Sequence, residues 1–294
     1  MTKKPYLAMI VSIIAVSFAS IFILTCTAHP LSISFYRILF TTILVLPFVV
    51  FRKKNRKEIR TLPLPKILFM ILIGIILALH FALWITSLTQ TSVASSVILV
   101  TAHPMIVAPI AHYLLKERLA KINILGIVLS VSGVIILVSE NYYTTTTLDS
   151  LEGNILAMLG GVAAGLYILG GRKTRNTVSI FSYAAIVYAS ATTTLFCICI
   201  LLQAPIIGLS ATDYGLIFLM ALISGIFGHT LYNWSLKYIR ASIASVMLLG
   251  EPIGSTLLAF AIPWIKQQPP QFSLIGGSLI LVGIYLTARV QHLE

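Results

Sequence analysis

Apolar stretches about as long as a bilayer is thick follow one another along the whole chain, with short polar breaks between them. A helix rises about 1.5 Å per residue, so about 20 apolar residues cross a hydrocarbon core roughly 30 Å thick. Only 10% of the 294 residues are charged and 58% are hydrophobic, whereas soluble domains carry about 25% charged residues. We therefore predict an all-α polytopic membrane protein with ten transmembrane helices. The predicted spans cover residues 6–26, 32–51, 66–88, 92–115, 122–139, 153–171, 179–202, 213–236, 241–264 and 272–290.

The lysines and arginines predict the direction of these spans. If the N-terminus is cytoplasmic, 18 of the 20 basic residues fall on the cytoplasmic side, as the positive-inside rule requires. They are Lys3 and Lys4; Arg52, Lys53, Lys54, Arg56, Lys57, Arg60 and Lys66; Lys116, Arg118 and Lys121; Arg172, Lys173 and Arg175; Lys237 and Arg240; and Arg289. The formal charge of +12 therefore indicates membrane topology and anionic lipid at the cytoplasmic face rather than a nucleic-acid partner. We predict a multi-pass protein of the plasma (inner) membrane with both termini in the cytoplasm.

The second half of the chain repeats the first. Residues 84–104 match residues 232–252 at an offset of 148, and Gly126 and Gly133 match Gly276 and Gly283 at an offset of 150. The two repeats, residues 1–140 and 150–294, each contain five predicted spans. Because five is odd, the second repeat must enter the membrane upside down relative to the first. Such inverted repeats are typical of secondary transporters, which bind substrate near the midplane where the halves meet.

The motifs of both halves resemble the EamA domain of the drug/metabolite transporter superfamily. In the first half these are Thr-Ser-Val-Ala-Ser-Ser-Val at 91–97, His103-Pro104, Leu-Lys-Glu-Arg at 115–118 and the glycines at 126 and 133; in the second, Ala-Ser-Ile-Ala-Ser-Val at 241–246, Glu251-Pro252 and the glycines at 276 and 283. The resemblance covers essentially the whole chain. It implies a carrier for amino acids, related metabolites or drugs, often an exporter, with a central site lined chiefly by spans 1, 3, 4, 6, 8 and 9. The chain departs from the pattern in having His103 before the first proline and no acid in the second half that matches Glu117.

Two ionisable side chains occupy equivalent positions near the middle of predicted spans. His103 precedes Pro104 and Glu251 precedes Pro252, and each proline is expected to break its helix and leave a carbonyl without its usual partner. Glu251 is the only acidic residue deep within any predicted span, and such residues tend to mark substrate pathways or proton relays. We predict that Glu251 binds a substrate amine or carries a coupling proton. The alternative is a structural carboxyl group that is hydrogen-bonded to a neighbouring helix.

Further polar and aromatic side chains fall on the same helical stripes. Aromatic faces suit amine recognition, although interfacial belts and ordinary packing give the same pattern. Arg37, near the external end of span 2, either snorkels outward or steers a carboxylate into the pathway. The candidate substrate-binding residues are His80, Trp84, Ser96, His103, His229, Tyr232, Asn233, Glu251 and Ser255.

These features predict a secondary transporter that moves a small metabolite by alternating access, with coupling ion, direction and a monomeric or homodimeric state left open. The chain lacks HExxH and GxxxxGK[ST] motifs, so we predict neither an enzyme nor an ATP-driven pump, and no cofactor. The alternative is a metal-ion carrier or channel with His80, His103, His229 and Glu251 as ligands. The histidines have no recurring spacing and one acid compensates little charge, so no resident metal site is predicted.

Overall fold

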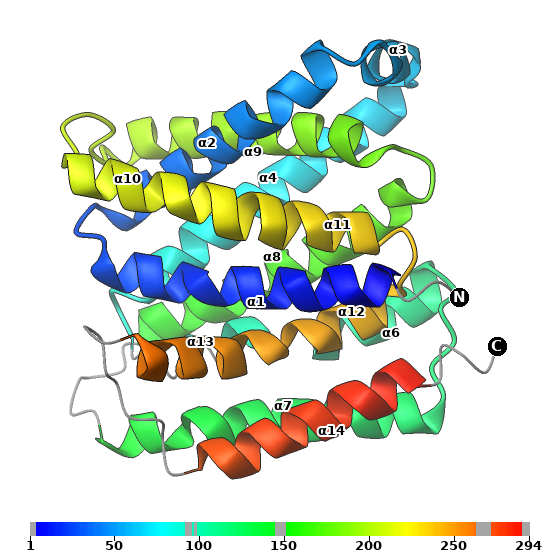
Figure 1. Cartoon of the computed structure of the whole chain (residues 1–294), viewed down its shortest axis with the longest axis vertical. Helices are drawn as coiled ribbons and strands as arrows, with labels where there is room; N and C mark the ends of the chain where they lie inside the picture. Colours follow the sequence, from blue (N-terminus) through cyan, green and yellow to red (C-terminus); the bar gives the residue numbers. More distant parts are fainter. Residues whose placement is uncertain (1–3, 92–95, 97–98, 145–150, 263–271, 290–294) are drawn as a thin grey trace.

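The computed structural model describes residues 4–91, 96, 99–144, 151–262 and 272–289, and these residues form helices joined by turns, with no strand among them. The helices lie side by side and run across the view in Figure 1, while the stack that they form extends vertically. The start of α1 and the end of α14 lie at the same end of the molecule, on the right of Figure 1. The all-helical prediction is confirmed for the described part of the chain.

The order of the elements follows the sequence repeat. The first half contains α1 (Lys4–Thr25), α2 (Pro30–Val50), α3 (Lys53–Thr61), α4 (Leu64–Ser87), α6 (Pro104–Leu114) and α7 (Lys121–Thr144). The second half contains α8 (Leu151–Arg175), α9 (Ile180–Leu201), α10 (Ala211–Met220), the π-helix η1 (Ala221–Thr230), α11 (Leu231–Ser235), α12 (Ala241–Leu248), α13 (Gly250–Ala261) and α14 (Ser273–Arg289).

Most of these helices have the length and apolarity of membrane spans. Among the described residues, 7 helical segments qualify: Lys4–Thr25, Pro30–Val50, Leu64–Ser87, Leu151–Arg175, Ile180–Leu201, Ala211–Ser235 and Ala241–Leu258. Three further apolar helices are shorter, at Leu99–Leu114, Lys121–Ile136 and Leu274–Ala288. Large apolar side chains such as Leu7, Leu201 and Leu274 are exposed on the outer surface, which suits contact with lipid rather than water.

Two helices are interrupted close to the prolines that the sequence singled out, one residue before Pro104 and three residues before Pro252. α6 begins at Pro104, and residues 102 and 103 form a turn. α12 and α13 are separated at Leu249, whose N–H bonds to the carbonyl of Val246 at 3.0 Å instead of continuing the α-helical pattern. Pro252 then lies in the first turn of α13, where its missing N–H costs no intrahelical hydrogen bond.

The structure contains one helix that the hydropathy pattern did not predict. Residues 53–61, which we expected to be a cytoplasmic loop, form the short basic helix α3. Its one buried residue, Asn55, donates to the carbonyl of Phe48 at 2.8 Å and so fixes α3 against the end of α2. A search for apolar runs does not detect α3, because eight of its nine residues are polar or charged and Ile59 is its one apolar residue.

Corresponding helices in the two halves have corresponding neighbours. α4 packs against α8 and α9, and η1, which occupies the equivalent place in the second half, packs against α1 and α2. α2 packs against its own counterpart α9, and α7 packs against its counterpart α14. The pairs α2–α9 and α7–α14 lie at the top and bottom of the stack in Figure 1.

Glycines bring α7 and α14 into backbone contact. A Cβ atom on Gly126 would lie 2.6 Å from the carbonyl oxygen of Gly283, and one on Gly133 would lie 2.6 Å from that of Gly276. These distances leave no room for a side chain, so the repeated glycines are required by close helix packing.

Two carboxylates, one from each half of the chain, accept hydrogen bonds from the other half where its first two helices meet. Asp213, at the start of α10, accepts hydrogen bonds from the Thr27 N–H at 2.8 Å and the Thr27 hydroxyl at 2.9 Å, in the turn between α1 and α2. Glu58 of α3 accepts from the Ser179 N–H at 2.9 Å and the Ser182 hydroxyl at 2.6 Å, in the turn between α8 and α9. Figure 1 shows α3 on the right and the start of α10 on the left.

Candidate functional site

A buried arginine lies at the centre of the polar interior. Arg37 of α2 has an exposed fraction of 1%, and its Cζ atom lies 4.2 Å from the centroid of the Phe81 ring on α4. Its Nη1 atom has no hydrogen-bond partner among the described residues. The snorkelling interpretation is therefore wrong, because a snorkelling side chain would expose its guanidinium. The interior contains a cation that an anionic group could neutralise.

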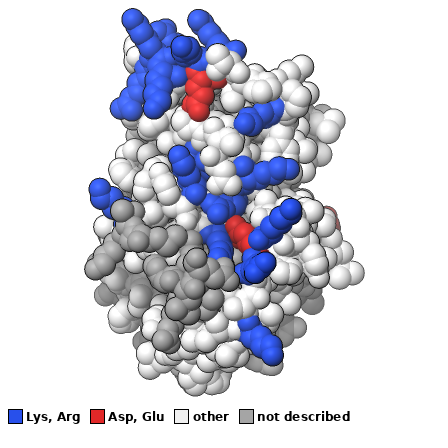
Figure 2. All heavy atoms as spheres, turned by 90° about the vertical axis from the view of Figure 1, so that its right-hand side faces the viewer, with Lys and Arg blue, Asp and Glu red and all other residues white. Residues whose placement is uncertain are grey.

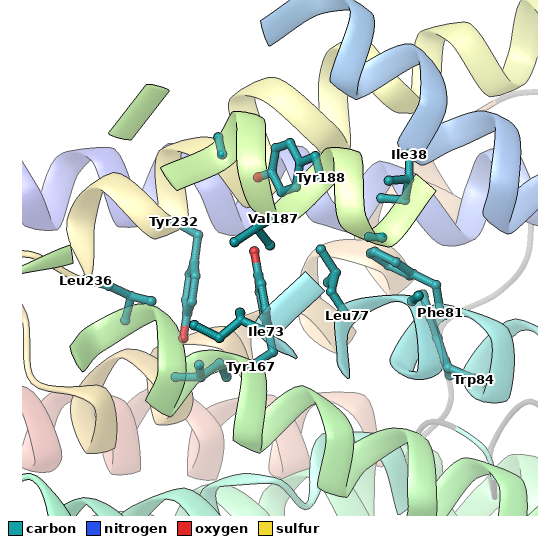
Figure 3. Close-up of a cluster of buried hydrophobic side chains, with 14 of the residues drawn as sticks. Ile38, Ile73, Leu77, Phe81, Trp84, Tyr167, Val187, Tyr188, Tyr232 and Leu236 are labelled. Atoms are coloured by element: carbon teal, nitrogen blue, oxygen red, sulfur yellow. The ribbon is translucent and has the colours of Figure 1, made fainter. Parts of the chain in front are cut away.

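Imidazole and indole rings extend from this cation along α4. His80 stacks on Trp84 with ring centroids 5.9 Å apart and an interplanar angle of 6°, and its Nδ1 atom lies 2.9 Å from the carbonyl oxygen of Gly160. Phe81 meets the ring of His229 edge-on at 5.3 Å. Figure 3 shows Phe81 and Trp84 side by side on α4. The result is a wall of flat rings from two helices, with the Trp84 Nε1 atom lacking a described partner.

His103 and Glu251 lie at equivalent contacts with two other helices. A Cβ atom on Gly165 of α8 would lie 3.7 Å from the Cβ of His103. The carbonyl of Glu251 accepts a hydrogen bond from the Ser17 hydroxyl on α1 at 3.3 Å. Position 17 precedes position 165 by 148 residues, which is the repeat offset of this part of the chain. The two ionisable residues therefore lie against equivalent positions of α8 and α1.

Arg37 and Glu251 are not paired with each other. Within the described part of the chain the ion pair joins Arg172 and Glu117. The Arg37 cation is therefore not neutralised by a direct contact with Glu251.

Other predicted site residues lie apart from this group. Tyr232 is buried in the apolar core beside Leu236 and Ile73, and Figure 3 places it at the opposite end of that cluster from Trp84. Asn233 donates from its side chain to the Tyr167 hydroxyl at 2.5 Å and the carbonyl of His229 at 2.7 Å.

The two predicted serines are occupied by helix–helix hydrogen bonds. The hydroxyls of Ser96 and Ser87 are 2.7 Å apart, and Ser255 donates to the carbonyl of Ser17 at 3.1 Å. These serines join neighbouring segments. Of the predicted residues, His80, Trp84 and His229 are linked to Arg37 by ring contacts through Phe81, whereas His103 and Glu251 contact α8 and α1.

Neither Arg37 nor Phe81 was among the residues predicted to bind substrate. A signal for Arg37 was present, since Ser34, Arg37 and Thr41 recur at helical spacing on one side of α2, and all three are buried. A polar stripe of this kind faces protein rather than lipid. Phe81 gave no signal, because one aromatic residue among many apolar residues does not reveal which way it faces.

The metal-carrier alternative needs His80, His103, His229 and Glu251 to converge. The described residues contain no group of three or more His, Cys, Asp or Glu side chains that could hold a metal ion. In this conformation the four side chains therefore do not form a ligand set.

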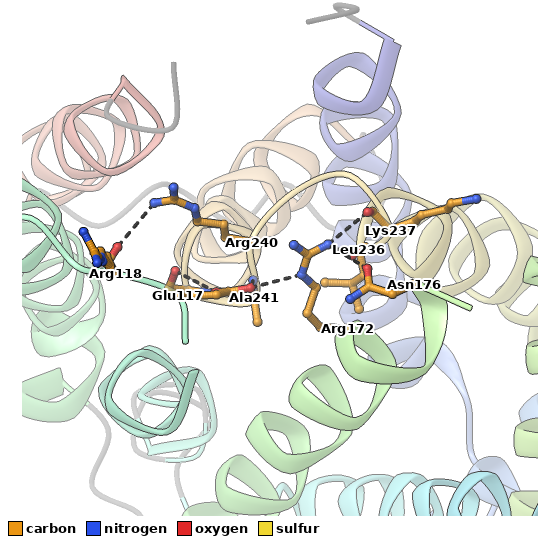
Figure 4. A network of polar contacts seen from close by, with 9 residues as sticks. Glu117, Arg118, Arg172, Asn176, Leu236, Lys237, Arg240 and Ala241 are labelled. Atoms are coloured by element: carbon orange, nitrogen blue, oxygen red, sulfur yellow. Dashed lines mark hydrogen bonds and ion pairs between the residues drawn. The ribbon is translucent and has the colours of Figure 1, made fainter. Parts of the chain in front are cut away.

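A second polar network lies at the end of the molecule where α1 begins. The Glu117 carboxylate pairs with Arg172 Nε at 3.0 Å and accepts hydrogen bonds from the N–H groups of Ala241 at 3.0 Å and Ser242 at 3.3 Å. Arg172 also donates to the carbonyl of Leu236 at 2.8 Å. Figure 4 shows that Glu117 thereby caps α12 and links it to α8, as a carboxylate does at a helix N-terminus.

Comparison with known proteins agrees with this architecture. The model of the EamA-like transporter family matches residues 3–139 and again residues 151–289. An uncharacterized transporter of Bacillus subtilis, YyaM, is 26% identical over 227 residues, which cover 75% of this chain and 72% of the relative. An uncharacterized transporter of Archaeoglobus fulgidus is 25% identical over 267 residues, covering 90% and 89% of the two chains. A solved structure with 16% sequence identity shares the fold, with a TM-score of 0.78 and 99% of each chain covered.

The apolar helices and the polar interior, taken with these relatives, define a multi-pass integral membrane protein that acts as a transporter rather than an enzyme. The chain belongs to the EamA-like transporter family, and its two matches span both halves of the sequence. The family resemblance seen in the sequence motifs is confirmed.

Proposed function

We propose that this protein is a ten-span secondary transporter that moves a small metabolite by alternating access between two five-helix repeats, residues 1–140 and 150–294, of opposite orientation. Contacts between equivalent residues support this arrangement. The Ser130 hydroxyl donates to the carbonyl of its repeat counterpart Ile280, 150 residues away, at 3.3 Å.

Two-fold symmetry accounts for these self-matching contacts. Gly126 meets Gly283 while Gly133 meets Gly276, so exchanging each glycine for its repeat counterpart reproduces the same pair of contacts. The pairing also makes α7 and α14 antiparallel. A two-fold axis that relates two neighbouring antiparallel helices is perpendicular to them. If the helices span the membrane, this axis lies in the membrane plane, as it does in transporters with inverted repeats.

The basic end of the molecule is proposed to face the cytoplasm. Figure 2 shows lysines and arginines gathered on the end where α3 and the start of α1 lie. The positive-inside rule assigns such an end to the cytoplasm. Both termini would then be cytoplasmic, in the plasma (inner) membrane.

The proposed substrate is a small amphipathic metabolite with a carboxylate, such as an amino acid or a related compound. Arg37 supplies a desolvated cation for the carboxylate, and the rings of His80, Phe81 and Trp84 supply a flat apolar wall. Glu251 is positioned to bind an amine or to carry a coupling proton. The family resemblance favours export. The observation that carries the proposal is the buried guanidinium of Arg37, with which no carboxylate of the described residues forms an ion pair.

A ligand-stabilisation screen followed by flux measurements in proteoliposomes tests this proposal. A charge-assisted hydrogen bond contributes about 1.5–3 kcal/mol, so Arg37→Gln should weaken binding of a carboxylate ligand by about tenfold or more. Arg37→Lys should recover part of the affinity, because it keeps the charge but loses the planar fork. Arg60→Gln, an exposed position on α3, is the matched control. Unchanged affinity and flux in Arg37→Gln would exclude the carboxylate role.

Glu251 is tested separately by the pH dependence of transport. If it carries the coupling proton, Glu251→Gln should abolish the response of flux to an imposed proton gradient while substrate binding is retained. If it binds the amine instead, the variant should lose binding of amine-bearing compounds and keep binding of their deaminated analogues. Normal flux with an unchanged pH profile would rule out both roles.

A further inference from the structure

A basic pocket lies at the proposed cytoplasmic end, away from the group around Arg37. It has a volume of about 520 Å³ and is lined by Leu115, Lys116, Glu117, Arg118, Arg172 and Arg240. Four cationic side chains thus surround one carboxylate. Figure 4 shows Glu117 with Arg118, Arg172 and Arg240 around it.

The carboxylate contributes little to the accessible part of the pocket. Glu117 has an exposed fraction of 7%, and its oxygens already accept from Arg172 and from the N–H groups of Ala241 and Ser242. Lys116 and Arg118, by contrast, are exposed. The surface that a ligand meets is therefore strongly cationic.

The arginines come from both halves of the chain. Arg118 follows α6 in the first repeat, whereas Arg172 and Arg240 belong to the second. Arg240 donates to the carbonyl of Arg118 at 3.3 Å, which brings these two segments together across the pocket in Figure 4. Planar guanidinium groups match the oxygens of a phosphate group and pair with them through two parallel hydrogen bonds.

We propose that this pocket binds the phosphate group of an anion, supplied by an anionic phospholipid headgroup or by a phosphate-bearing solute. The volume exceeds what a bare phosphate ion needs and leaves space for the group esterified to it. Because the ligand would touch residues of both repeats, it binds best when they meet at this end, and it therefore stabilises the conformation described here. The site is independent of the substrate role proposed for Arg37.

Thermal unfolding of the full-length protein in neutral detergent tests the proposal. The probes are inorganic phosphate, short-chain phosphatidylglycerol and, as the zwitterionic comparison whose phosphate charge is balanced by choline, short-chain phosphatidylcholine. We expect saturable stabilisation by phosphate, phosphatidylglycerol or both, and none by phosphatidylcholine. Stabilisation by phosphatidylglycerol alone identifies lipid as the source, whereas stabilisation by inorganic phosphate alone identifies a solute. The proposal is overturned if both lipids stabilise the protein equally. It is also overturned if neither inorganic phosphate nor phosphatidylglycerol stabilises it.

A pair of double variants locates the binding. Lys116→Gln/Arg118→Gln removes two charges from the exposed rim of the pocket and should weaken the apparent affinity about tenfold or more. Lys53→Gln/Lys57→Gln removes two exposed charges from α3 on the same end of the molecule and should leave the affinity unchanged. If the rim variant does not fold, the single change Arg118→Glu gives the same comparison. Equal losses in the rim and α3 variants would show a diffuse surface effect and refute the pocket.

Discussion

The guanidinium of Arg37 and the ring of Phe81 form a cation–π contact, 4.2 Å from Cζ to the ring centroid, in the interior between α2 and α4. Such a contact is worth about 2 kcal/mol or more when it is desolvated. It offsets part of the free-energy cost of burying an arginine that forms no ion pair with any carboxylate in the part of the chain that the structure describes. The ring also leaves the edge of the guanidinium available to another partner.

A double-mutant cycle measures this contact. Arg37→Met, Phe81→Leu and the double variant should show a coupling free energy of about 0.5–2 kcal/mol in equilibrium unfolding from detergent micelles. Phe35 provides the control, because its buried ring on α2 packs on Tyr36 and Phe196. The same cycle with Arg37→Met and Phe35→Leu should give a coupling free energy near zero. A coupling near zero for Phe81 as well would show that the contact contributes no stability.

Glu117→Gln should destabilise the protein more than other substitutions of a glutamate. The neutral amide loses the ion pair to Arg172 and the charge that caps α12, and a hydrogen bond to a charged group contributes about 1.5–3 kcal/mol. Glu152→Gln, exposed in the first turn of α8, provides the comparison. The midpoint of thermal unfolding at neutral pH should be clearly lower for Glu117→Gln than for Glu152→Gln. Equal midpoints would contradict the capping role.

The contacts of Glu58 predict a loss of stability in acid. Burial raises the pKa of this carboxyl group, but hydrogen bonds from Ser179 and Ser182 and the charge of Arg175 outweigh burial, so its pKa is lowered from 4.5. A lowered pKa in the folded state contributes stability that is fully present above the unfolded pKa and is lost as the pH falls through the folded pKa. Unfolding midpoints measured from pH 7 to pH 3 should therefore decline below about pH 4.5. In Glu58→Gln that part of the decline should be absent, and an unchanged profile would count against the prediction.

Gly133→Ala should destabilise the protein by about 1–3 kcal/mol, the usual cost of overpacking. The added methyl group meets the carbonyl oxygen of Gly276 at 2.6 Å, so α7 and α14 must move apart. Gly277→Ala on α14 is the control, because a Cβ atom there meets nothing within 4 Å. This control should be neutral or slightly stabilising, since alanine favours helices. Equal effects of the two changes would mean that the glycine contact is not close.

Hydropathy and the sequence repeat predicted the helical segments but not which way each helix faces. In a soluble helix the apolar stripe marks the buried side. Here both sides of a helix are apolar, so the sequence did not show that Tyr232 and Trp84 pack at opposite ends of one buried apolar cluster. The orientation of Arg37 and the location of α3 depend on tertiary contacts, such as Phe81 against Arg37 and Phe48 against Asn55, that no local pattern encodes.

The hydrogen bond between Ser130 of α7 and the carbonyl of Ile280 on α14 joins a pair of repeat counterparts. In the alternating-access cycle proposed above, each repeat takes the shape of the other, so each residue takes the former surroundings of its counterpart. The distance between Ser130 and Ile280 is then the same in the two end states. Probes attached at these two positions should therefore report equal distances when the site opens to either side of the membrane.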